Sequence, residues 1–272
     1  MRSRVNRAAV LGRPIGHSLS PVLHRAAHAA LGLTDWTYEA LDLGADELPV
    51  LLAGLDDEWR GFSVTMPCKQ AAAAVADESD ALPRLLGAAN TLVRTPTGWR
   101  AENTDVTGVG MALQLAGVEQ VDHAAVLGGG GTAAAAAVAL ASLGAQTVDV
   151  VVRDAERAAG VLHVLDALEV TGRVRLFADT PEVAAPVVVS TVPVDGQTTV
   201  AGLHWTAGQT VLDVLYAGWP TPLASAVQAA GGTPVHGIEV LFWQATVQVE
   251  LITGRPAPIE AMRTALDAVL AR

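Results

Sequence analysis

The stretch from residue 123 to residue 152 limits the possible folds more than any other part of the sequence. A short apolar run at 123–127 is followed by four consecutive glycines, an alanine-rich segment at 132–143 and a run of mostly β-branched residues at 147–152. Two parallel strands need a helical crossover between them, and this order supplies one. The stretch therefore predicts a strand–helix–strand unit in a parallel sheet.

The same alternation of short apolar runs and helical patterns extends over the rest of the chain. Strands are expected at 8–11, 37–41, 61–65, 187–190 and 210–213, and helices at 47–55, 223–229, 240–252 and from Ile259. Ser20 and Pro21 are typical of a helix start, with Ser20 as the N-cap. The segments 91–94 and 99–102 flank a Thr-Pro-Thr-Gly turn and predict a hairpin. These patterns indicate an α/β fold with a mostly parallel sheet covered on both faces.

A length of 272 residues and the restart of the pattern near residue 122 favour two domains. We expect the first to span residues 1–106 and to regain the C-terminal helices at about 240–272. The second is expected at 107–239. No internal repeat and no low-complexity linker interrupts this order.

The composition excludes several classes of protein. The net charge of −11 argues against nucleic acid and anionic membranes as partners, since both require a basic surface. Cys68 is the only cysteine, so an intramolecular disulfide and a cysteine-based zinc site are excluded, and no cluster of ligand residues predicts another metal. The basic start at residues 1–7 precedes an apolar run too short for a signal peptide. We therefore expect a soluble, cytoplasmic protein.

The glycine-rich turn has the spacing of a dinucleotide-binding site. In Gly128-x-Gly130-x-x-Ala133 the first glycine permits the tight turn, the second lets a pyrophosphate approach the backbone, and the small third residue lets helix and strand pack closely. Gly131 and Thr132 open the helix, whose N-terminus favours an anion. Four glycines alone would fit a flexible turn equally well. The surrounding strand–helix–strand pattern favours a Rossmann-like dinucleotide-binding domain.

The end of the second strand of this unit indicates the type of cofactor. Arg153 follows the strand directly and Arg157 lies one helical turn later, so two guanidinium groups could flank a 2′-phosphate. An NAD site would carry an acid at this point to bind the ribose. Asp154 could serve that role or neutralise Arg153, and the arginines could be ordinary surface residues. We favour NADP over NAD.

Four polar segments follow predicted strands in the N-terminal half, where α/β proteins build their sites. They are His17–Ser20, Thr65–Lys69, Ala89–Thr91 and Asn103–Asp105. Taken singly, each has a local explanation as a cap, a turn or a surface residue. Together they are typical of a site for a polyhydroxylated carboxylic acid, with Lys69 and Asp105 as an acid/base pair.

The motifs resemble those of the shikimate dehydrogenase family over nearly the whole chain. The first is GRPIGHSLSPVLH at 12–24, and the second is GFSVTMPCK at 61–69. GAANTL at 87–92, ENTDVTG at 102–108, the glycine turn with its arginines, DVLY at 213–216, TPL at 221–223 and 237–244 follow in the family's order. Ser63 departs from the family, which usually has Asn there. Departures also occur at Arg25, Val152, Asp154, Ser190 and 217–218.

The resemblance implies that the chain reduces 3-dehydroshikimate to shikimate with NADPH, in the synthesis of aromatic amino acid precursors. It assigns the substrate and the catalytic residues to the first domain and NADP to the second. Lys69 and Asp105 would be the catalytic pair. Ser18 and Ser20 would hold the substrate carboxylate with help from Tyr216, and Thr65, Asn90 and Gln244 would bind ring hydroxyls. Gly237 would line the nicotinamide site.

Other functions stay open at this point. NAD-dependent oxidation of quinate or shikimate would use the same fold and the same Lys/Asp pair, and Asp154 is compatible with it. A non-catalytic sensor of a shikimate-like ligand is a second alternative, although binding alone does not require an acid/base pair. A folate-dependent or tRNA-linked dehydrogenase is disfavoured by Ser18, Ser20 and the acidic charge. The sequence does not indicate the oligomeric state, and we favour a homodimer.

Overall fold

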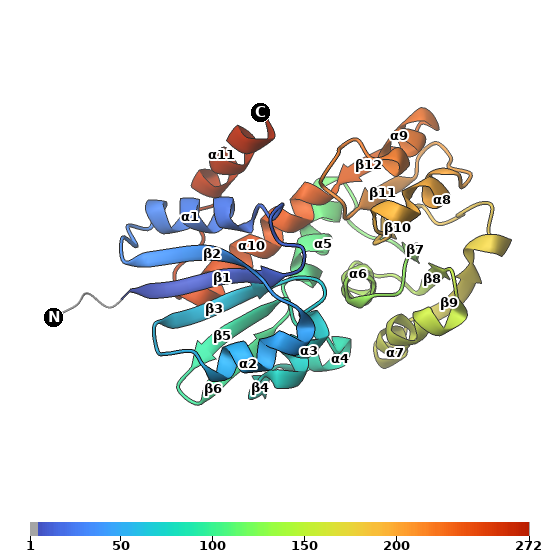
Figure 1. Ribbon diagram of the computed structural model, residues 1–272. Coiled ribbons are helices and arrows are strands. Elements are labelled where there is room, and N and C mark those ends of the chain that lie inside the picture. The colour runs from blue at the N-terminus through green and yellow to red at the C-terminus, as the bar shows by residue number, and fades with distance from the viewer. Residues whose placement is uncertain (1–4, 272) are drawn as a thin grey trace. The chain divides into compact units, whose positions relative to one another are not determined.

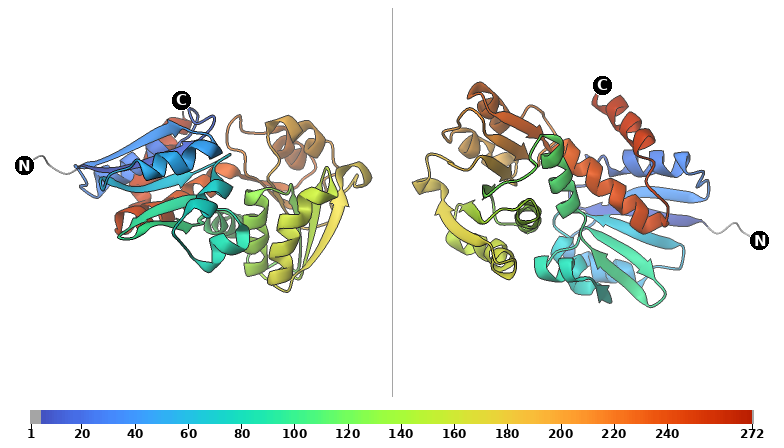
Figure 2. Two further views of the ribbon diagram at one scale, coloured as in Figure 1. Left: turned by 60° about the horizontal axis from the view of Figure 1, so that its bottom comes forward. Right: turned by 180° about the vertical axis from the view of Figure 1, so that it is seen from behind.

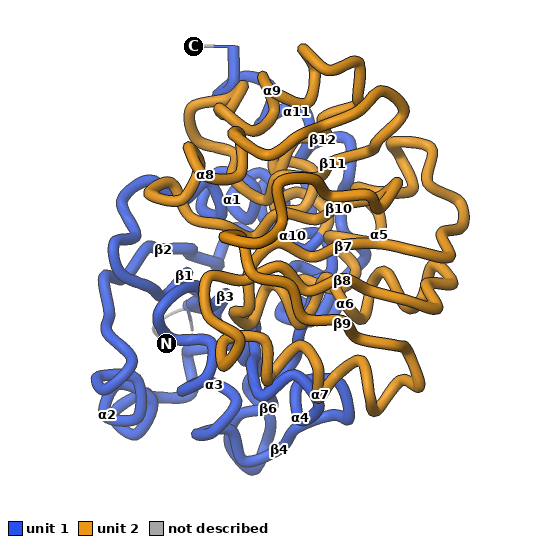
Figure 3. The backbone as a smooth tube through the Cα atoms, turned by 90° about the vertical axis from the view of Figure 1, so that its right-hand side faces the viewer, with its two compact units in different colours: residues 1–104, 244–272 blue, residues 105–243 orange. Residues whose placement is uncertain are grey.

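The computed structural model describes residues 5–271 and divides the chain into two compact units, coloured separately in Figure 3. Unit 1 contains residues 1–104 and 244–272, and unit 2 contains residues 105–243. The chain enters unit 2 at Asp105 and returns to unit 1 at Gln244, within the helix α10 (Gly237–Thr253). Residues 1–4, which include most of the basic start, and residue 272 lie outside the described part.

Unit 1 is built on a six-stranded mixed sheet (Figure 1). Its strands are β1 (Asn6–Gly12), β2 (Trp36–Asp42), β3 (Trp59–Val64), β4 (Glu78–Ser79), β5 (Thr91–Thr95) and β6 (Gly98–Glu102), in the order β2-β1-β3-β5-β6-β4. The pairs β1/β2, β1/β3 and β4/β6 are parallel, and β3/β5 and β5/β6 are antiparallel. The predicted hairpin at 91–102 is confirmed, as are the strands predicted at 8–11, 37–41 and 61–65.

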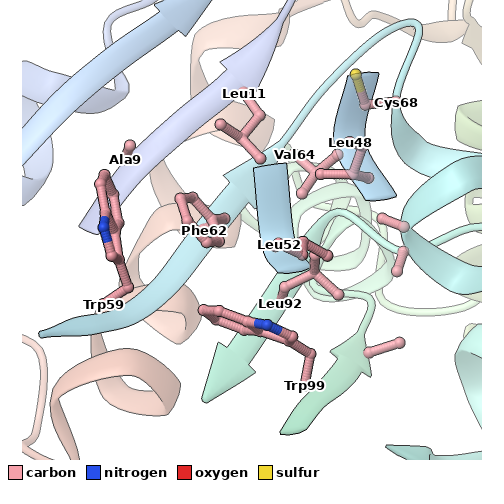
Figure 4. Close-up of a cluster of buried hydrophobic side chains, with 13 residues drawn as sticks. Ala9, Leu11, Leu48, Leu52, Trp59, Phe62, Val64, Cys68, Leu92 and Trp99 are labelled. Carbon is pink, nitrogen blue, oxygen red and sulfur yellow. The ribbon is translucent and has the colours of Figure 1, made fainter. Parts of the chain in front are cut away.

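Helices cover both faces of this sheet. Successive residues of β1 point to opposite faces and pack in two separate cores. Ala9 and Leu11 pack in a core with Leu48 and Leu52 of α2 (Leu48–Ala53) and the aromatic side chains of β3 and β6, as Figure 4 shows. Ala8 and Val10 pack instead in a core with residues that include Ile252 of α10. The small α3 (Lys69–Val75) and α4 (Ala81–Leu86) complete the first side.

On the other face, α1 (Ser20–Ala30) contacts β1 and β2, and α11 (Ile259–Leu270) lies beside α1 (Figure 2). One prediction about α1 was wrong in detail. Ser20 is the first helical residue and not the N-cap, and its side chain makes no capping bond. The hydroxyl of Ser18 instead accepts from the main-chain N–H of Ser20, at 3.3 Å. The helix therefore begins one residue earlier than predicted, with Leu19 at the N-cap position.

Unit 2 is a doubly wound α/β unit. Its strands are β7 (His123–Leu127), β8 (Thr147–Val152), β9 (Thr171–Leu176), β10 (Val187–Ser190), β11 (Thr210–Asp213) and β12 (Thr233–His236). All neighbouring pairs are parallel, in the order β12-β11-β10-β7-β8-β9. Counted from β7, this is the order 3-2-1-4-5-6 of a Rossmann fold. The strands predicted at 123–127, 147–152, 187–190 and 210–213 are confirmed.

The helices of unit 2 are α5 (Asp105–Leu115), α6 (Gly131–Ser142), α7 (Ala159–Ala167), α8 (Gln197–Ala201) and α9 (Pro222–Ala229). Residues 133–140 of α6 are all buried, and its alanines allow close packing against β7, β10 and α5. The alanine-rich stretch is therefore core, as predicted. No helix within residues 5–271 is long and apolar enough to cross a membrane.

Candidate functional site

Two of the predicted polar segments of unit 1 lie side by side because they follow the adjacent parallel strands β1 and β3. The N–H of Thr65 donates to the carbonyl of Leu11 at 2.8 Å, and the N–H of Arg13 donates to the carbonyl of Met66 at 3.0 Å. A side chain at Gly12 would collide with the methyl group of Thr65. The glycine thus lets the loop that carries Ser18 and Ser20 approach the turn that carries Thr65.

The serine loop is held at its base by an ion-pair cluster. The guanidinium of Arg13 contacts the carboxylates of Asp42 at 2.6 Å and Glu47 at 2.9 Å. The second carboxylate also accepts from the N–H of Gly44 at 2.7 Å. All of these side chains are about half exposed, so each pair contributes little to stability. Their geometric effect is to tether the start of the loop to the segment after β2.

Lys69 is placed by the turn between β3 and α3. Cys68 donates its N–H to the carbonyl of Thr65 at 2.8 Å, which closes the turn, and Lys69 is the first residue of α3. The carbonyl of Lys69 accepts from the N–H of Ala89 at 2.9 Å. The lysine is half-buried. This backbone bond places Lys69 next to the Ala89–Asn90 segment, which the sequence had grouped with it.

Asn90 is the centre of a buried amide and hydroxyl cluster and is only 1% exposed. Its Oδ1 accepts from the main-chain N–H of Thr104 at 2.8 Å and from the hydroxyl of Thr91 at 2.9 Å. Its Nδ2 donates to the hydroxyl of Thr104 at 2.9 Å and to Oε1 of Gln244 at 3.1 Å. A main-chain N–H can only donate, so it settles which end of the Asn90 amide carries the oxygen.

The remaining predicted residues of this group are close in sequence to the cluster. Asn103 is buried and donates from Nδ2 to the carbonyl of Ala88 at 3.0 Å. Asp105 directly follows Thr104, is the first residue of α5 and is 6% exposed. His17, by contrast, is exposed. A carboxylate so largely removed from water is costly unless it is compensated, which is typical of a functional or a tightly bonded group.

The sequence reasoning missed Gln248, which the structure joins to this cluster. Gln248 lies one helical turn beyond Gln244 on α10, and both are buried. Its Nε2 donates to the carbonyl of Asn90 and to the hydroxyl of Thr91, each at 3.0 Å. The available signal was a pair of glutamines at i and i+4 in a mostly apolar helix.

In unit 2, the glycine-rich turn follows β7 at the point where the strand order reverses, which is where doubly wound proteins bind ligands. Gly128 has a φ of +113°, which favours glycine. An added Cβ at Gly128 would collide with the hydroxyl of Thr191, and one at Gly129 with the carbonyl of Arg157. Nothing lies within 4 Å of the position that a Cβ would take at Gly130. Close neighbours therefore require glycine at 128 and 129, whereas the space beside Gly130 is open.

The turn fits the pyrophosphate of a dinucleotide. Gly130 is the N-cap of α6 and has no side chain with which to cap the helix, and helix N-termini favour an anion. Arg153 and Arg157 are exposed and follow β8. Asp154, between them, accepts from the N–H of Glu156 at 3.1 Å and caps the short helix η2 (Ala155–Ala158). Asp154 therefore has a local structural role.

Tyr216 lies in the loop after β11, which is fixed at its base by a buried carboxylate. Asp213 accepts from Thr221 Oγ1 at 2.8 Å, Gln197 Nε2 at 3.1 Å and the N–H of Leu215 at 3.2 Å. Burial raises the pKa of Asp213, and these three donors counteract that rise. Tyr216 is half-buried.

Gly237 starts α10 at a point with no room for a side chain. A Cβ there would collide with the main chain of Val214 in the Tyr216 loop. His236, the preceding residue, accepts the N–H of Ile238 at its Nδ1 at 2.8 Å, and its ring packs on Trp219 with 4.0 Å between centroids. Packing within unit 2 thus requires a glycine at position 237, apart from its predicted role in lining the nicotinamide site.

Family models match both ends of the chain. One described as "Shikimate dehydrogenase substrate binding domain" matches residues 10–92, and one described as "Shikimate 5'-dehydrogenase C-terminal domain" matches residues 237–266. The chain is also 37% identical over 268 residues to the shikimate dehydrogenase (NADP(+)) of Anaeromyxobacter dehalogenans (strain 2CP-1 / ATCC BAA-258), and 95% of each chain is covered.

Solved structures show the same similarity. The shikimate dehydrogenase of Mycobacterium tuberculosis is 48% identical and superposes with a TM-score of 0.87, covering 97% of this chain and 99% of that chain. The shikimate 5-dehydrogenase of Thermus thermophilus, solved in complex with NADP(H) and shikimate, is 29% identical, with a TM-score of 0.84 and coverage of 97% and 99%.

Proposed function

This chain belongs to the shikimate dehydrogenase family, and on that premise we propose that Lys69 and Asp105 are its catalytic pair. The enzyme is an NADP-dependent oxidoreductase that interconverts 3-dehydroshikimate and shikimate. The observation that supports the proposed site best is the backbone bond from Ala89 to Lys69, which sets a lysine beside a buried amide cluster. A lysine whose backbone lies beside several oriented amides and hydroxyls supports a site for a polyhydroxylated ligand.

We assign the substrate to a domain of residues 1–106 and about 240–272, whose limits lie within a few residues of those of unit 1. Ser18 and Ser20 bind the carboxylate, to which Tyr216 also contributes. Thr65, Asn90 and Gln244 bind ring hydroxyls, since each offers a hydroxyl or an amide and the last two already share a hydrogen bond. Buried polar groups of this kind reject ligands that lack the matching hydroxyl, because their own hydrogen bonds would then be unmade.

We assign the cofactor to residues 107–239. Gly128, Gly130, Gly131 and Thr132 hold the pyrophosphate, Arg153 and Arg157 the 2′-phosphate, and Gly237 lines the nicotinamide site. NADPH supplies the hydride when it is bound. The protein supplies the proton: Lys69 Nζ stabilises the negative charge that develops on the carbonyl oxygen and transfers a proton to it. Asp105 is the proposed partner of Lys69 in that proton transfer.

The test is a spectrophotometric assay of the purified protein with shikimate or quinate, each paired with NADP or NAD. We expect the highest kcat/KM for shikimate with NADP. A preference for quinate with NAD would establish the alternative dehydrogenase activity. Binding of shikimate without turnover with either cofactor would establish a sensor and overturn the catalytic assignment.

Removing both guanidinium groups in the Arg153→Ala/Arg157→Ala double variant is expected to raise the KM for NADP by about 10–100-fold, because charge-assisted bonds to the 2′-phosphate are lost. The KM for NAD, which has no such phosphate, changes little. Arg173→Ala on β9 is the matched control, since it removes an exposed positive charge from the same unit. A parallel rise for NAD in the double variant would show that the arginines do not recognise the 2′-phosphate.

Three finer assignments complete the proposal. We propose that the enzyme acts in the cytoplasm, assembles as a homodimer and binds no nucleic acid. The last follows from the net charge of −11, which opposes binding to a polyanion. Light scattering of the purified protein tests the homodimer, since a monomeric mass would exclude it.

A further inference from the structure

A chain of buried hydrogen bonds connects β2 to the proposed substrate-binding amide of Asn90. Tyr38 donates to Ser63 Oγ at 2.6 Å, and Ser63 donates to Gln248 Oε1 at 2.7 Å. Gln248 donates to Thr91 Oγ1 at 3.0 Å, and Thr91 donates to Asn90 Oδ1 at 2.9 Å. These five side chains come from β2, β3, α10 and the start of β5, and all are buried. We call them the Tyr38–Asn90 chain.

Every donor in this chain has a fixed direction. The second N–H of Gln248 donates to the carbonyl of Asn90, which also accepts from the N–H of Val64 at 2.7 Å, so both N–H groups of Gln248 are engaged. Gln248 Oε1 must then be the end that accepts from Ser63. The hydroxyl of Thr91 accepts from Gln248 and therefore has its proton available for Asn90 Oδ1. If the Asn90 amide were reversed, its Nδ2 would face the hydroxyl proton of Thr91, and both groups are donors.

The chain depends on the short side chain of Ser63, which is hydrogen-bonded to both Tyr38 and Gln248. Burial raises the pKa of Tyr38, so its hydroxyl stays protonated as the first donor of the chain. The ring of His24 stacks on the ring of Tyr38, with 4.1 Å between the two centroids.

We propose that Gln248 and Thr91 are positioning residues that, together with the main-chain N–H of Thr104, hold the Asn90 amide in its orientation toward the substrate ring. This inference rests on the proposed function, because it needs Asn90 to bind a ring hydroxyl. Neither residue has to touch the substrate. Their effect reaches it through Asn90, whose Nδ2 donates to Gln244 and Thr104 while Oδ1 accepts from both Thr91 and the main-chain N–H of Thr104.

The sharpest test compares Thr91→Val with Thr91→Ser. Valine keeps the shape and removes the hydroxyl, whereas serine keeps the hydroxyl. We expect Thr91→Val to raise the KM for shikimate by about 10-fold, since a buried hydrogen bond to Asn90 Oδ1 is lost and the amide is held less firmly. The kcat and the KM for NADP change less than 2–3-fold, roughly the scatter of such single-site effects. Thr91→Ser restores the wild-type KM for shikimate.

Thr180→Val, which alters a buried threonine in unit 2, is the control for the general cost of such a change. If Thr91→Val does not fold, Ser63→Ala interrupts the chain two bonds earlier, and its KM for shikimate is expected to rise in the same direction. Equal KM values for shikimate in the valine and serine variants, or equal losses in kcat and in both KM values, would overturn the positioning role. Turnover of shikimate by the wild-type enzyme tests the proposed function separately.

Discussion

Shikimate oxidation by the Lys69→Ala variant is expected to be slower by about 10²–10⁴-fold in kcat, the usual contribution of a positioned acid or base. The reason is the proposed role of the ammonium group in stabilising charge on the reacting oxygen and moving its proton. The fold should tolerate the change, because Lys69 is only half-buried at the first position of the short helix α3. The measurement is kcat for shikimate at saturating NADP, beside the melting temperature.

Gln70→Ala is the matched control, since Gln70 is the next residue of α3 and is exposed. It should leave kcat unchanged. The affinity of the Lys69 variant for NADP, measured by calorimetry, should match that of the wild type because the cofactor is assigned to the other unit. A kcat of Lys69→Ala within about 10-fold of the wild-type value would be a smaller loss than removal of a general acid causes. That result would show that Lys69 is not the proton donor.

The free energy of unfolding is expected to fall steeply as the pH drops from about 6.5 to 4, because two histidines are buried in their neutral forms. Burial lowers the pKa of His24 to about 3, with a further contribution from His28, and lowers the pKa of His28 to about 4. In the unfolded chain both titrate near 6.5. Below that value the unfolded state binds more protons than the native state, so acid favours unfolding.

Each histidine contributes a slope of about 1.4 kcal/mol per pH unit within this window, or about 2.7 kcal/mol per unit for the pair. The stabilisation is complete above about pH 6.5 and is lost as the pH falls toward the native-state pKa values. The surroundings explain the preference for neutral rings. His24 stacks on Tyr38, and His28 packs against Trp36 with 5.2 Å between centroids. Among the described residues, His24 Nδ1 and His28 Nε2 have no hydrogen-bond partner.

Urea unfolding between pH 6.5 and 5 measures this slope above the range in which most carboxylates titrate. The variant His28→Leu should lose about half of the slope. His163→Leu, at an exposed position on α7, is the control and should keep all of it. An unchanged slope in His28→Leu would mean that other groups cause the acid sensitivity.

The positions of most helices and strands follow from the local sequence pattern, but a few strands show only a weak pattern. The strands at 147–152, 187–190 and 210–213 are short β-branched runs, and the structure places them at those residues. The strand β9 was not predicted. It lies at an edge of its sheet and is largely exposed, and its alternation of polar and apolar residues covers only positions 173–176. The four-residue β12 contains a proline, which also weakens a strand pattern.

The sequence by itself determined the α/β class, the dinucleotide-binding turn and the set of polar segments at strand ends, because turns, periodicity and motif spacing are properties of neighbouring residues. Only the tertiary structure decided how the amides of the site are oriented. Asn90 and Gln244 are 154 positions apart, and Asn90 and Gln248 are 158 apart. Their hydrogen bonds form only when α10 returns to the first sheet, and burial then requires every donor to find an acceptor. That requirement acts in three dimensions, so the local pair of glutamines in α10 could not reveal the partners of Gln248 or the direction of the chain that ends at Asn90.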